Sequence, residues 1–441
     1  MEFDANALTQ SVAFGQTEME ANQKKSTHQT IDSCRICGNR CLTPILSLGE
    51  QALTGIFPKS KDDLVISGPL DLVRCDETVT HGACGLVQLR QTYNKTQMFS
   101  GDYGYRSGLN PSMVEHLRHR VGRILELVPL QEGDLVLDIG SNDGTLLGFY
   151  PSNVERVGID PTGAFFQAYY PSPVVLIPHF FSERIFQERF SGRKAKVITS
   201  IAMFYDLDEP LHFMRQIYRI LADDGVWVLE QSYLPTLLAV NSYDTICHEH
   251  LEYYRLKTIL WMIQEVGFKV IDLERNDVNG GSFSVTLAKA NALYQERKDL
   301  IGQWLHEEEG QGLSTSKPYD SFRSRVTEQR QRLQDLIHRM SSQGQRIIGY
   351  GASTKGNVIL QYCQLSPQVL PCIGEVNEKK YGCYTPGTRI PIVSEREAKA
   401  LKPNILLILP WHFKSFFLQK EKAYLASGGK LFFPLPEPTL C

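Results

Sequence analysis

Four cysteines in the first part of the chain have a type and spacing that suit a metal site. They are Cys34, Cys37, Cys75 and Cys84. Two pairs of thiolates can hold zinc tetrahedrally, and a closed site of this kind stabilises a fold rather than performing catalysis. The second pair is more widely spaced than usual, so Cys41 and His81 remain alternative ligands. Buried free cysteines are the other interpretation of these residues.

A glycine-containing turn with acidic neighbours could bind a nucleoside. Residues 138–144, DIGSNDG, overlap the end of an apolar run, and Asp160 ends the next one. Open α/β sheets bind ligands at the carboxyl ends of strands, where glycine lets the backbone approach closely. Acids at two strand ends repel phosphate and favour S-adenosylmethionine, whose ammonium and sulfonium groups attract carboxylates; a tight turn without a ligand is the alternative. The predicted cofactor residues are Asp138, Gly140, Asn142, Asp143, Gly144 and Asp160, with Ser200 and Ala202 in a further wall segment.

The segment at residues 243–254 concentrates groups that transfer protons. Its sequence, YDTICHEHLEYY, contains His248, Glu249 and His250 in succession. A histidine can accept a proton near neutral pH, and a neighbouring carboxylate can orient its ring. The order H-E-H differs from the H-E-x-x-H motif of zinc proteases, whose histidines share one helical face. The segment is a candidate for acid–base catalysis, with a polar surface loop as the alternative.

A second glycine-rich turn follows an apolar run near the end of the chain. Residues 349–357 read GYGASTKGN. Backbone N–H groups at a helix start, together with Lys355, can hold a phosphate. The Walker pattern is not met, because Lys355 precedes Gly356 instead of following it. A purely structural turn is the alternative.

Alternating strands and helices must position these groups. Short apolar runs predict strands at residues 135–139, 156–160, 196–201, 226–230, 268–273 and 282–288. Helix-length segments separate most of them, which predicts a largely parallel sheet with an antiparallel hairpin formed by the last two strands at its edge. A second α/β unit is predicted from the runs at 346–351, 369–375, 405–409 and 430–433.

We therefore expect an α/β protein with five segments. Residues 1–31 are polar and lack apolar periodicity, which is typical of a disordered tail. The others are a zinc-binding module of short pieces at 32–92, a first α/β domain at 93–292, an exposed helical connector at 293–343, and a Rossmann-like domain at 344–441.

Composition narrows the class of protein. The 441 residues exceed what one hydrophobic core usually holds, roughly 250–300 residues. A net charge of −3 provides no basic surface for nucleic acid. No apolar run approaches the roughly 18–20 residues that span a bilayer, and the opening lacks a signal-type apolar core. We expect a cytoplasmic protein with reduced cysteines and no membrane partner.

The combined motifs resemble the sugar C-methyltransferases of deoxysugar biosynthesis. The motifs occur in that family's order: the cysteine pairs, the turn at 138–144, the segment C-H-E-H at 247–250, and the turn with Lys355. The resemblance spans residues 34–436. It implies an N-terminal zinc-binding region, a class I methyltransferase domain that binds S-adenosylmethionine, and a Rossmann-like C-terminal domain. The implied reaction is methyl transfer to a carbon beside a ketone, on a nucleotide-linked 4-keto deoxysugar.

The resemblance also implies roles for individual residues. His250 is the expected base with Glu249 beside it, and Tyr103 or Tyr105 would position the sugar or stabilise the enolate oxygen. The expected substrate-binding residues are His248, Tyr254, Asn279, Gly280, Lys355 and Asn357. Cys247 departs from the family, which commonly has tyrosine there, and this bears on the choice of substrate. Methylation of an oxygen or nitrogen, and a non-catalytic module that binds zinc and cofactor, are the alternative functions.

Overall fold

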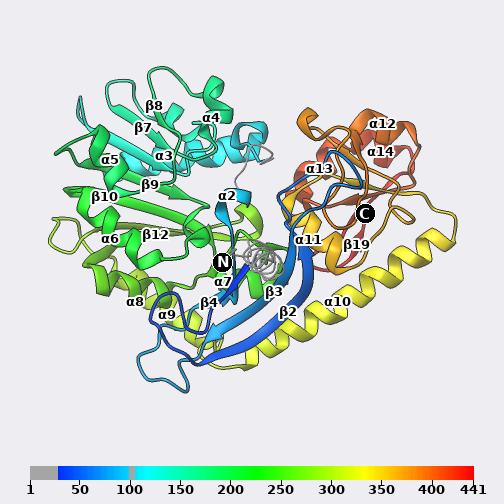
Figure 1. Cartoon of the computed structure of the whole chain (residues 1–441), viewed down its shortest axis with the longest axis horizontal. Coiled ribbons are helices and arrows are strands. Elements are labelled where there is room, and N and C mark those ends of the chain that lie inside the picture. Colours follow the sequence, from blue (N-terminus) through cyan, green and yellow to red (C-terminus); the bar gives the residue numbers. More distant parts are fainter. Residues whose placement is uncertain (1–27, 99–104) are drawn as a thin grey trace, which may run out of the picture.

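The computed structural model describes residues 28–98 and 105–441. Figure 1 shows two bodies of sheet and helix side by side, with a long hairpin and helix α10 (Lys317–Ser342) running along them. Residues 1–27 of the expected tail, and Tyr103, lie outside the described residues. His28–Thr30, which we expected in the tail, form strand β1 and pair with β5 (Gln91–Tyr93).

Seven strands form the central sheet, in the order β12-β13-β10-β9-β6-β7-β8. Their bounds are β6 Leu135–Ile139, β7 Glu155–Ile159, β8 Val175–Ile177, β9 Ala195–Ile201, β10 Leu221–Ser232, β12 Phe268–Asn276 and β13 Ser282–Lys289. Strand β13 is antiparallel to both of its neighbours, while the other pairs are parallel. The predicted strands and the edge hairpin are confirmed. Strand β8 was missed because three residues carry no periodic signal.

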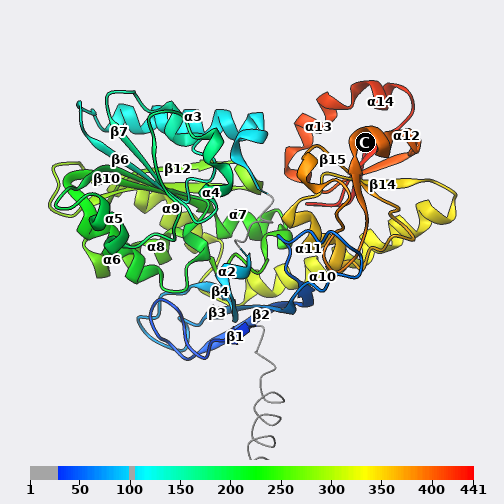
Figure 2. The same ribbon diagram turned by 45° about the horizontal axis from the view of Figure 1, so that its top comes forward.

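Helices cover both faces of the central sheet (Figure 2). Helix α3 (Pro111–Leu127) lies over one face, where its Leu117 and Val121 share an apolar cluster with Val136 of β6. On the other face lie α5 (Glu183–Arg189), α6 (Pro210–Ile220) and α8 (Leu256–Val266). The buried residues of α6 recur at helical spacing, so that one stripe faces the sheet. Each fully buried apolar side chain of this kind contributes about 1.5–3 kcal/mol to the stability of the fold.

The strand order creates the crevice where a ligand can bind. Strand β6 lies between β7 and β9, and all three run parallel. From its carboxyl end, β6 connects to β7 on one side, whereas β9 connects to β10 on the other. The place where the connections diverge is the switch point at which open α/β sheets bind ligands. The turn at 138–144 begins in the last residues of β6 and therefore lies at this point.

The N-terminal region is built on long strands rather than the short pieces we expected. Strands β2 (Leu42–Ala52) and β3 (Ser67–Cys75) form an antiparallel hairpin, extended by β4 (Val87–Leu89) and β11 (Glu252–Tyr253) in the order β11-β4-β3-β2. The register between β2 and β3 shifts in two places. These irregularities break the alternation of apolar and polar residues that identifies a strand in a sequence, which explains the wrong prediction.

A second, six-stranded sheet occupies the C-terminal part, in the order β16-β15-β14-β17-β18-β19. Its strands are β14 Ile347–Tyr350, β15 Ile373–Glu375, β16 Ile392–Ser394, β17 Ile405–Ile408, β18 Lys430–Phe433 and β19 Thr439–Leu440. Its helices are α11 Thr354–Tyr362, α12 Glu395–Ala400, α13 Lys414–Lys420 and α14 Lys422–Ala426. All neighbouring strands are parallel except β18 and β19. This is the predicted Rossmann-like arrangement.

The two helices between the sheets are α9 (Lys298–Gly310) and α10. We expected an exposed connector, but α10 buries one face that includes Phe322, Val326 and Leu333. These residues join the apolar cluster of the hairpin and the C-terminal sheet. The charged residues that suggested exposure lie on the opposite face, because helical spacing separates the two sets.

Direct contacts fix the C-terminal sheet against the central one. The Trp411 indole donates to Asp244 Oδ2 at 2.7 Å, and Lys355 Nζ donates to the Asn279 carbonyl at 2.6 Å. The carboxyl ends of both sheets consequently face one cavity. Within the described residues, no helix combines the length and apolar composition needed to cross a bilayer.

Candidate active site

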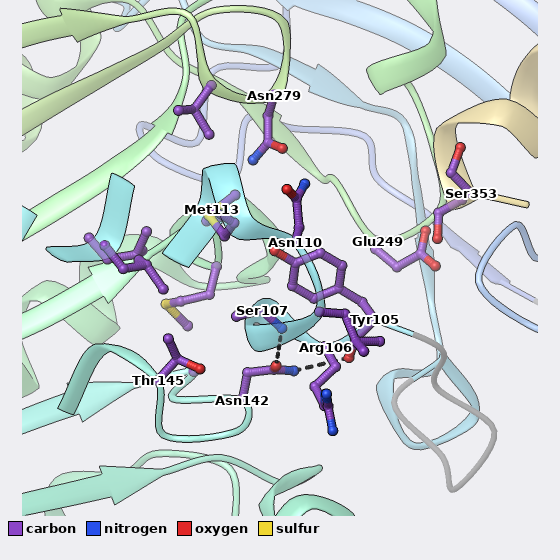
Figure 3. A pocket seen from close by; sticks show the side chains of 18 of the residues that line it. Tyr105, Arg106, Ser107, Asn110, Met113, Asn142, Thr145, Glu249, Asn279 and Ser353 are labelled. Atoms are coloured by element: carbon purple, nitrogen blue, oxygen red, sulfur yellow. Dashed lines mark hydrogen bonds between the residues drawn. The ribbon is translucent and has the colours of Figure 1, made fainter. Parts of the chain in front are cut away.

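A cavity of about 910 Å³ lies between the carboxyl ends of the central strands and the turn that precedes α11. Small-molecule sites are typically about 300–1,000 Å³, so this cavity is large enough for a cofactor and a second molecule. The predicted site residues that line it are Tyr105, Asp138, Gly140, Asn142, Asp160, Ala202, Glu249, His250, Asn279 and Lys355. Figure 3 shows several of these side chains converging on the same space.

The turn after β6 has a backbone shaped for close approach. Gly140, Asn142 and Gly144 all have positive φ, at 77°, 49° and 75°. A side chain at Gly140 would also come within 3.0 Å of Met203. The Asn142 amide bonds to the backbone of Tyr105 and Ser107, as the dashed lines in Figure 3 show. The turn thus holds the entry to α3 over the cavity.

Two carboxylates lie at neighbouring strand ends, as predicted. Asp160 accepts hydrogen bonds from the Asn142 N–H at 2.8 Å and from the Thr162 N–H and hydroxyl, both at 2.6 Å. Asp138 accepts from the Thr199 hydroxyl at 2.5 Å. Burial, together with the negative charge of the nearby Asp160, raises the pKa of Asp138 to about 7. The pair gives this end of the cavity the acidic character that suits ammonium and sulfonium groups.

Aromatic residues complete the cofactor end, and the sequence did not single them out. Phe180 and Phe181 follow β8 and line the cavity beside Asp160 and Thr162. Flat apolar rings and a carboxylate at adjacent strand ends suit an adenosine group. The residues present therefore fit S-adenosylmethionine. A pair of phenylalanines directly after a short strand was the only sequence signal for this wall.

Some predicted cofactor residues lie outside the cavity lining. Ser200 is buried in the sheet and accepts a hydrogen bond from the Trp227 indole at 3.2 Å. Asp143 accepts from the Gly108 N–H at 2.9 Å and forms an ion pair with Arg106 at 3.7 Å. Gly144 packs against Tyr170. None of the three lines the cavity, and their roles in binding the cofactor stay predictions.

His250 lines the same cavity. Its Nδ1 is 2.8 Å from the Thr245 carbonyl oxygen, which can only accept, so Nδ1 carries the proton and Nε2 is the basic atom. The Tyr205 ring packs edge-on against it at 4.3 Å. Burial, with the nearby Lys355 cation, lowers the pKa of His250 to about 3. The imidazole is therefore neutral at physiological pH, with Nε2 unprotonated.

Glu249 lines the cavity next to His250 and is held from the N-terminal hairpin. Its Oε2 lies 3.3 Å from the Thr54 hydroxyl, and its other oxygen lies against Gly55. Burial raises the pKa of this carboxyl. Cys247, two residues earlier, is fully buried and does not line the cavity.

Four predicted substrate residues do not reach the cavity. His248 is fully buried, with Nε2 3.1 Å from the Gln51 carbonyl, and burial lowers its pKa to about 4. Tyr254 is buried against Phe204. Asn357 donates to the Thr54 carbonyl at 2.8 Å, and Gly280 packs near Trp411. None of the four lines the cavity: His248 and Asn357 bond to the N-terminal hairpin, Tyr254 packs within the central domain, and Gly280 lies near Trp411 of the C-terminal part.

The C-terminal turn contributes further polar groups to the cavity. Glu375, at the end of β15, accepts from the Ala352 N–H at 2.6 Å, and Lys380 Nζ donates to the Ala352 carbonyl at 2.7 Å. His412 lines the same region with a buried Nδ1, and burial keeps its pKa well below the usual value. The sequence analysis did not assign these three residues to the site; Glu375 and Lys380 lie at and after the end of β15, and His412 follows β17.

The four predicted cysteines come together at the base of the hairpin. The sulfur atoms of Cys34, Cys37, Cys75 and Cys84 all lie within 4.8 Å of one another. A tetrahedron of thiolates around zinc has sulfur–sulfur edges of about 3.8 Å, so the cluster fits the ion. Cys41 is exposed and outside this cluster, and His81 is likewise not part of it. The zinc-binding prediction is confirmed.

Comparison with known proteins defines the class first. Residues 113–273 match the profile of a methyltransferase domain, residues 277–436 that of a C-methyltransferase C-terminal domain, and residues 34–99 that of a zinc binding domain. These matches, together with the parallel sheet and the turn after β6, define an S-adenosylmethionine-dependent methyltransferase.

A relative then gives the family. C-methyltransferase NovU of Streptomyces niveus is 31% identical over 412 residues, which are 92% of this chain and 96% of NovU. The chain belongs to this C-methyltransferase family.

Two solved structures share weaker similarity. N-methyltransferase NodS of Bradyrhizobium japonicum, in complex with S-adenosyl-L-homocysteine, is 13% identical with a TM-score of 0.31, covering 41% of this chain and 88% of NodS. An S-adenosylmethionine-dependent methyltransferase of Clostridium acetobutylicum is 10% identical with a TM-score of 0.32, covering 40% of this chain and 92% of that methyltransferase.

Substitution of Gly140 tests the cofactor end. A left-handed conformation costs a residue with a side chain about 1–2 kcal/mol, and Met203 adds a clash at this site. We expect Gly140→Ala to weaken S-adenosylmethionine binding by about tenfold, measured by isothermal titration calorimetry. Gly133→Ala is the matched control, since Gly133 has φ 82° with open space around it and does not line the cavity. Equal affinities for the two variants would contradict this placement of the cofactor.

Proposed function

We propose that this enzyme methylates a carbon next to the ketone of a nucleotide-linked 4-keto deoxysugar, with His250 as the general base. The observation that carries the proposal is the neutral His250 ring, whose Nδ1 is held by the Thr245 carbonyl while the ring lines the cavity shared with the cofactor turn. S-Adenosylmethionine, when bound, supplies a methyl group that is open to attack by a nucleophile.

Transfer to carbon requires a base more than transfer to a hydroxyl does. A carbon next to a ketone is a weak acid, and its proton must be removed before the carbon becomes nucleophilic. Burial disfavours the charged imidazolium of free His250. A negative enolate formed beside the ring offsets that cost, so His250 holds the proton while the enolate persists. Glu249 lies beside the ring and lines the cavity as well.

The turn that precedes α11 is suited to hold the nucleotide. Helix α11 has nine residues, and its N-terminus, capped by Ser353, faces the cavity. The Lys355 ammonium lies at the same end and lines the cavity. Backbone N–H groups and a lysine at a helix N-terminus attract phosphate. A diphosphate here would place the attached sugar toward His250, in the part of the cavity between the two sheets.

The test is the identity of the methylated atom. The enzyme is incubated with S-adenosylmethionine carrying a ¹³C-labelled methyl group and a panel of dTDP-linked and related 4-keto sugars, and products are examined by mass spectrometry and NMR. We expect a gain of one methyl group whose ¹³C signal couples to a sugar carbon. A methyl bonded to oxygen or nitrogen, or binding without turnover across the panel, would contradict the proposal.

A further inference from the structure

Asp206 lies at the catalytic end of the cavity without a role in the chemistry described so far. It ends the 3₁₀ helix η4 (Phe204–Asp206), which directly follows β9, and it lines the same cavity as Glu249 and His250. Its neighbour Tyr205 packs on the His250 ring. The Tyr205 carbonyl also accepts from the Leu251 N–H at 2.8 Å. Backbone and ring contacts therefore fix Asp206 next to the segment that carries the proposed base.

One oxygen of Asp206 is shielded and has no partner among the described residues. Oδ1 is buried from solvent and accepts no hydrogen bond from the described residues. A buried carboxylate oxygen without a donor loses its hydration without compensation. The loss is smaller if the carboxyl group is protonated, because the neutral group is less strongly hydrated. Asp206 differs in this from Asp160, which accepts three hydrogen bonds from the protein.

The groups around Asp206 favour its protonated form. Within the part of the chain that the structure describes, four of these groups are acidic or neutral, and Lys95 is the cation. The four are Glu249, Glu252, Cys247 and Tyr253. Burial raises the pKa of Asp206 well above the usual value for aspartate, and the Glu249 and Glu252 carboxyls raise it further. Lys95 acts in the opposite direction, but it is already paired with Asp208 at 3.0 Å. Two neighbouring carboxyls in a poorly hydrated site thus retain a proton between them.

We propose that Asp206 is a catalytic residue whose protonated carboxyl group donates a hydrogen bond to the ketone oxygen of the substrate while His250 removes the proton from the adjacent carbon. This assignment rests on the proposed function above. The C–H electron pair forms the new C=C bond, the carbonyl π pair moves to oxygen, and the proton passes to His250 Nε2. The Asp206 proton stays on its carboxyl and stabilises the oxyanion. When carbon takes the methyl group, the C=O bond forms again.

The experiment compares methyl transfer by Asp206→Ala and Asp206→Asn with that of wild type on the keto sugar identified above. Loss of one preorganised oxyanion donor lowers kcat by about 10²–10³-fold, and we expect this for the alanine variant with KM little changed. The asparagine variant keeps an N–H donor, so its loss should be at most about tenfold. Wild-type kcat should fall at alkaline pH as Asp206 ionises, whereas the asparagine variant should lack that fall.

Glu209→Gln is the matched control, because Glu209 is a nearby acid on the same connection that is exposed and does not line the cavity. We expect it to keep the wild-type rate and pH profile. Affinity for S-adenosylmethionine reports whether each variant is folded. Wild-type kcat in Asp206→Ala would overturn the assignment of Asp206 alone, as would equal losses in both Asp206 variants with an unchanged pH profile. A wild-type enzyme inactive on every keto sugar would overturn the proposed function and this assignment with it.

Discussion

Replacing His250 with alanine should lower kcat by about 10²–10⁴-fold, the usual contribution of a general base. The proposed proton acceptor, Nε2, is lost, while the turn at Gly140 and the Asp160 carboxylate, which line the same cavity, are unaltered by the substitution. Because the His250 side chain contacts Thr245 and Tyr205 rather than the cofactor turn, S-adenosylmethionine should bind with nearly unchanged affinity. Steady-state kinetics and calorimetric titration measure the two effects separately.

The control for this variant is His179→Ala, an exposed histidine after β8. It should retain wild-type turnover. His248 is unsuitable as a control, because it is fully buried against Gln51 and its loss would disturb the hairpin. Turnover by His250→Ala within a few fold of wild type would show that another group removes the proton.

The second large effect should come from removing one zinc ligand, which should lower the stability of the fold. Cys75 is fully buried in β3, and its sulfur lies 3.5 Å from that of Cys37. Structural zinc contributes about 10–16 kcal/mol of apparent binding free energy in small zinc-binding peptides, comparable to the entire stability of a domain, about 5–15 kcal/mol. We expect Cys75→Ser to lose bound zinc, measured by elemental analysis, and to unfold at a lower temperature, measured by calorimetry.

Loss of zinc should also disturb the active site. The hairpin carries the Thr54 hydroxyl to Glu249 and the Thr54 carbonyl to Asn357. Turnover should therefore fall together with zinc content. Cys41→Ser is the matched control, because Cys41 is exposed and outside the cluster. Wild-type zinc content in Cys75→Ser, or a loss in Cys41→Ser, would show that the ligand set is different.

Where residues are close in sequence and follow a strand, the sequence predicted their place in the fold well. The turn at 138–144 and Asp160 each come at the end of a strand with a clear apolar pattern, and parallel strands end at one edge of a sheet. The cysteine pairs were also identified correctly, because thiol spacing reflects metal geometry directly.

Prediction failed where the outcome depended on how loops pack. His248 and His250 are two residues apart in an irregular segment, and only the structure shows that His248 faces Gln51 while His250 faces the cavity. The hairpin of β2 and β3 was missed because register shifts interrupt its alternation. Asp206 and Glu375 come from separate connections, and nothing in the sequence places them beside the same ligand.

Solvent exchange at the carbon next to the ketone tests the central claim most directly. Wild-type and His250→Ala enzymes are incubated in D₂O with a nucleotide-linked 4-keto deoxysugar and S-adenosyl-L-homocysteine, and deuterium at that carbon is followed by NMR. The proposed base predicts incorporation with wild type and a loss of about 10²-fold or more in the variant. Equal incorporation by both enzymes would contradict the role of His250.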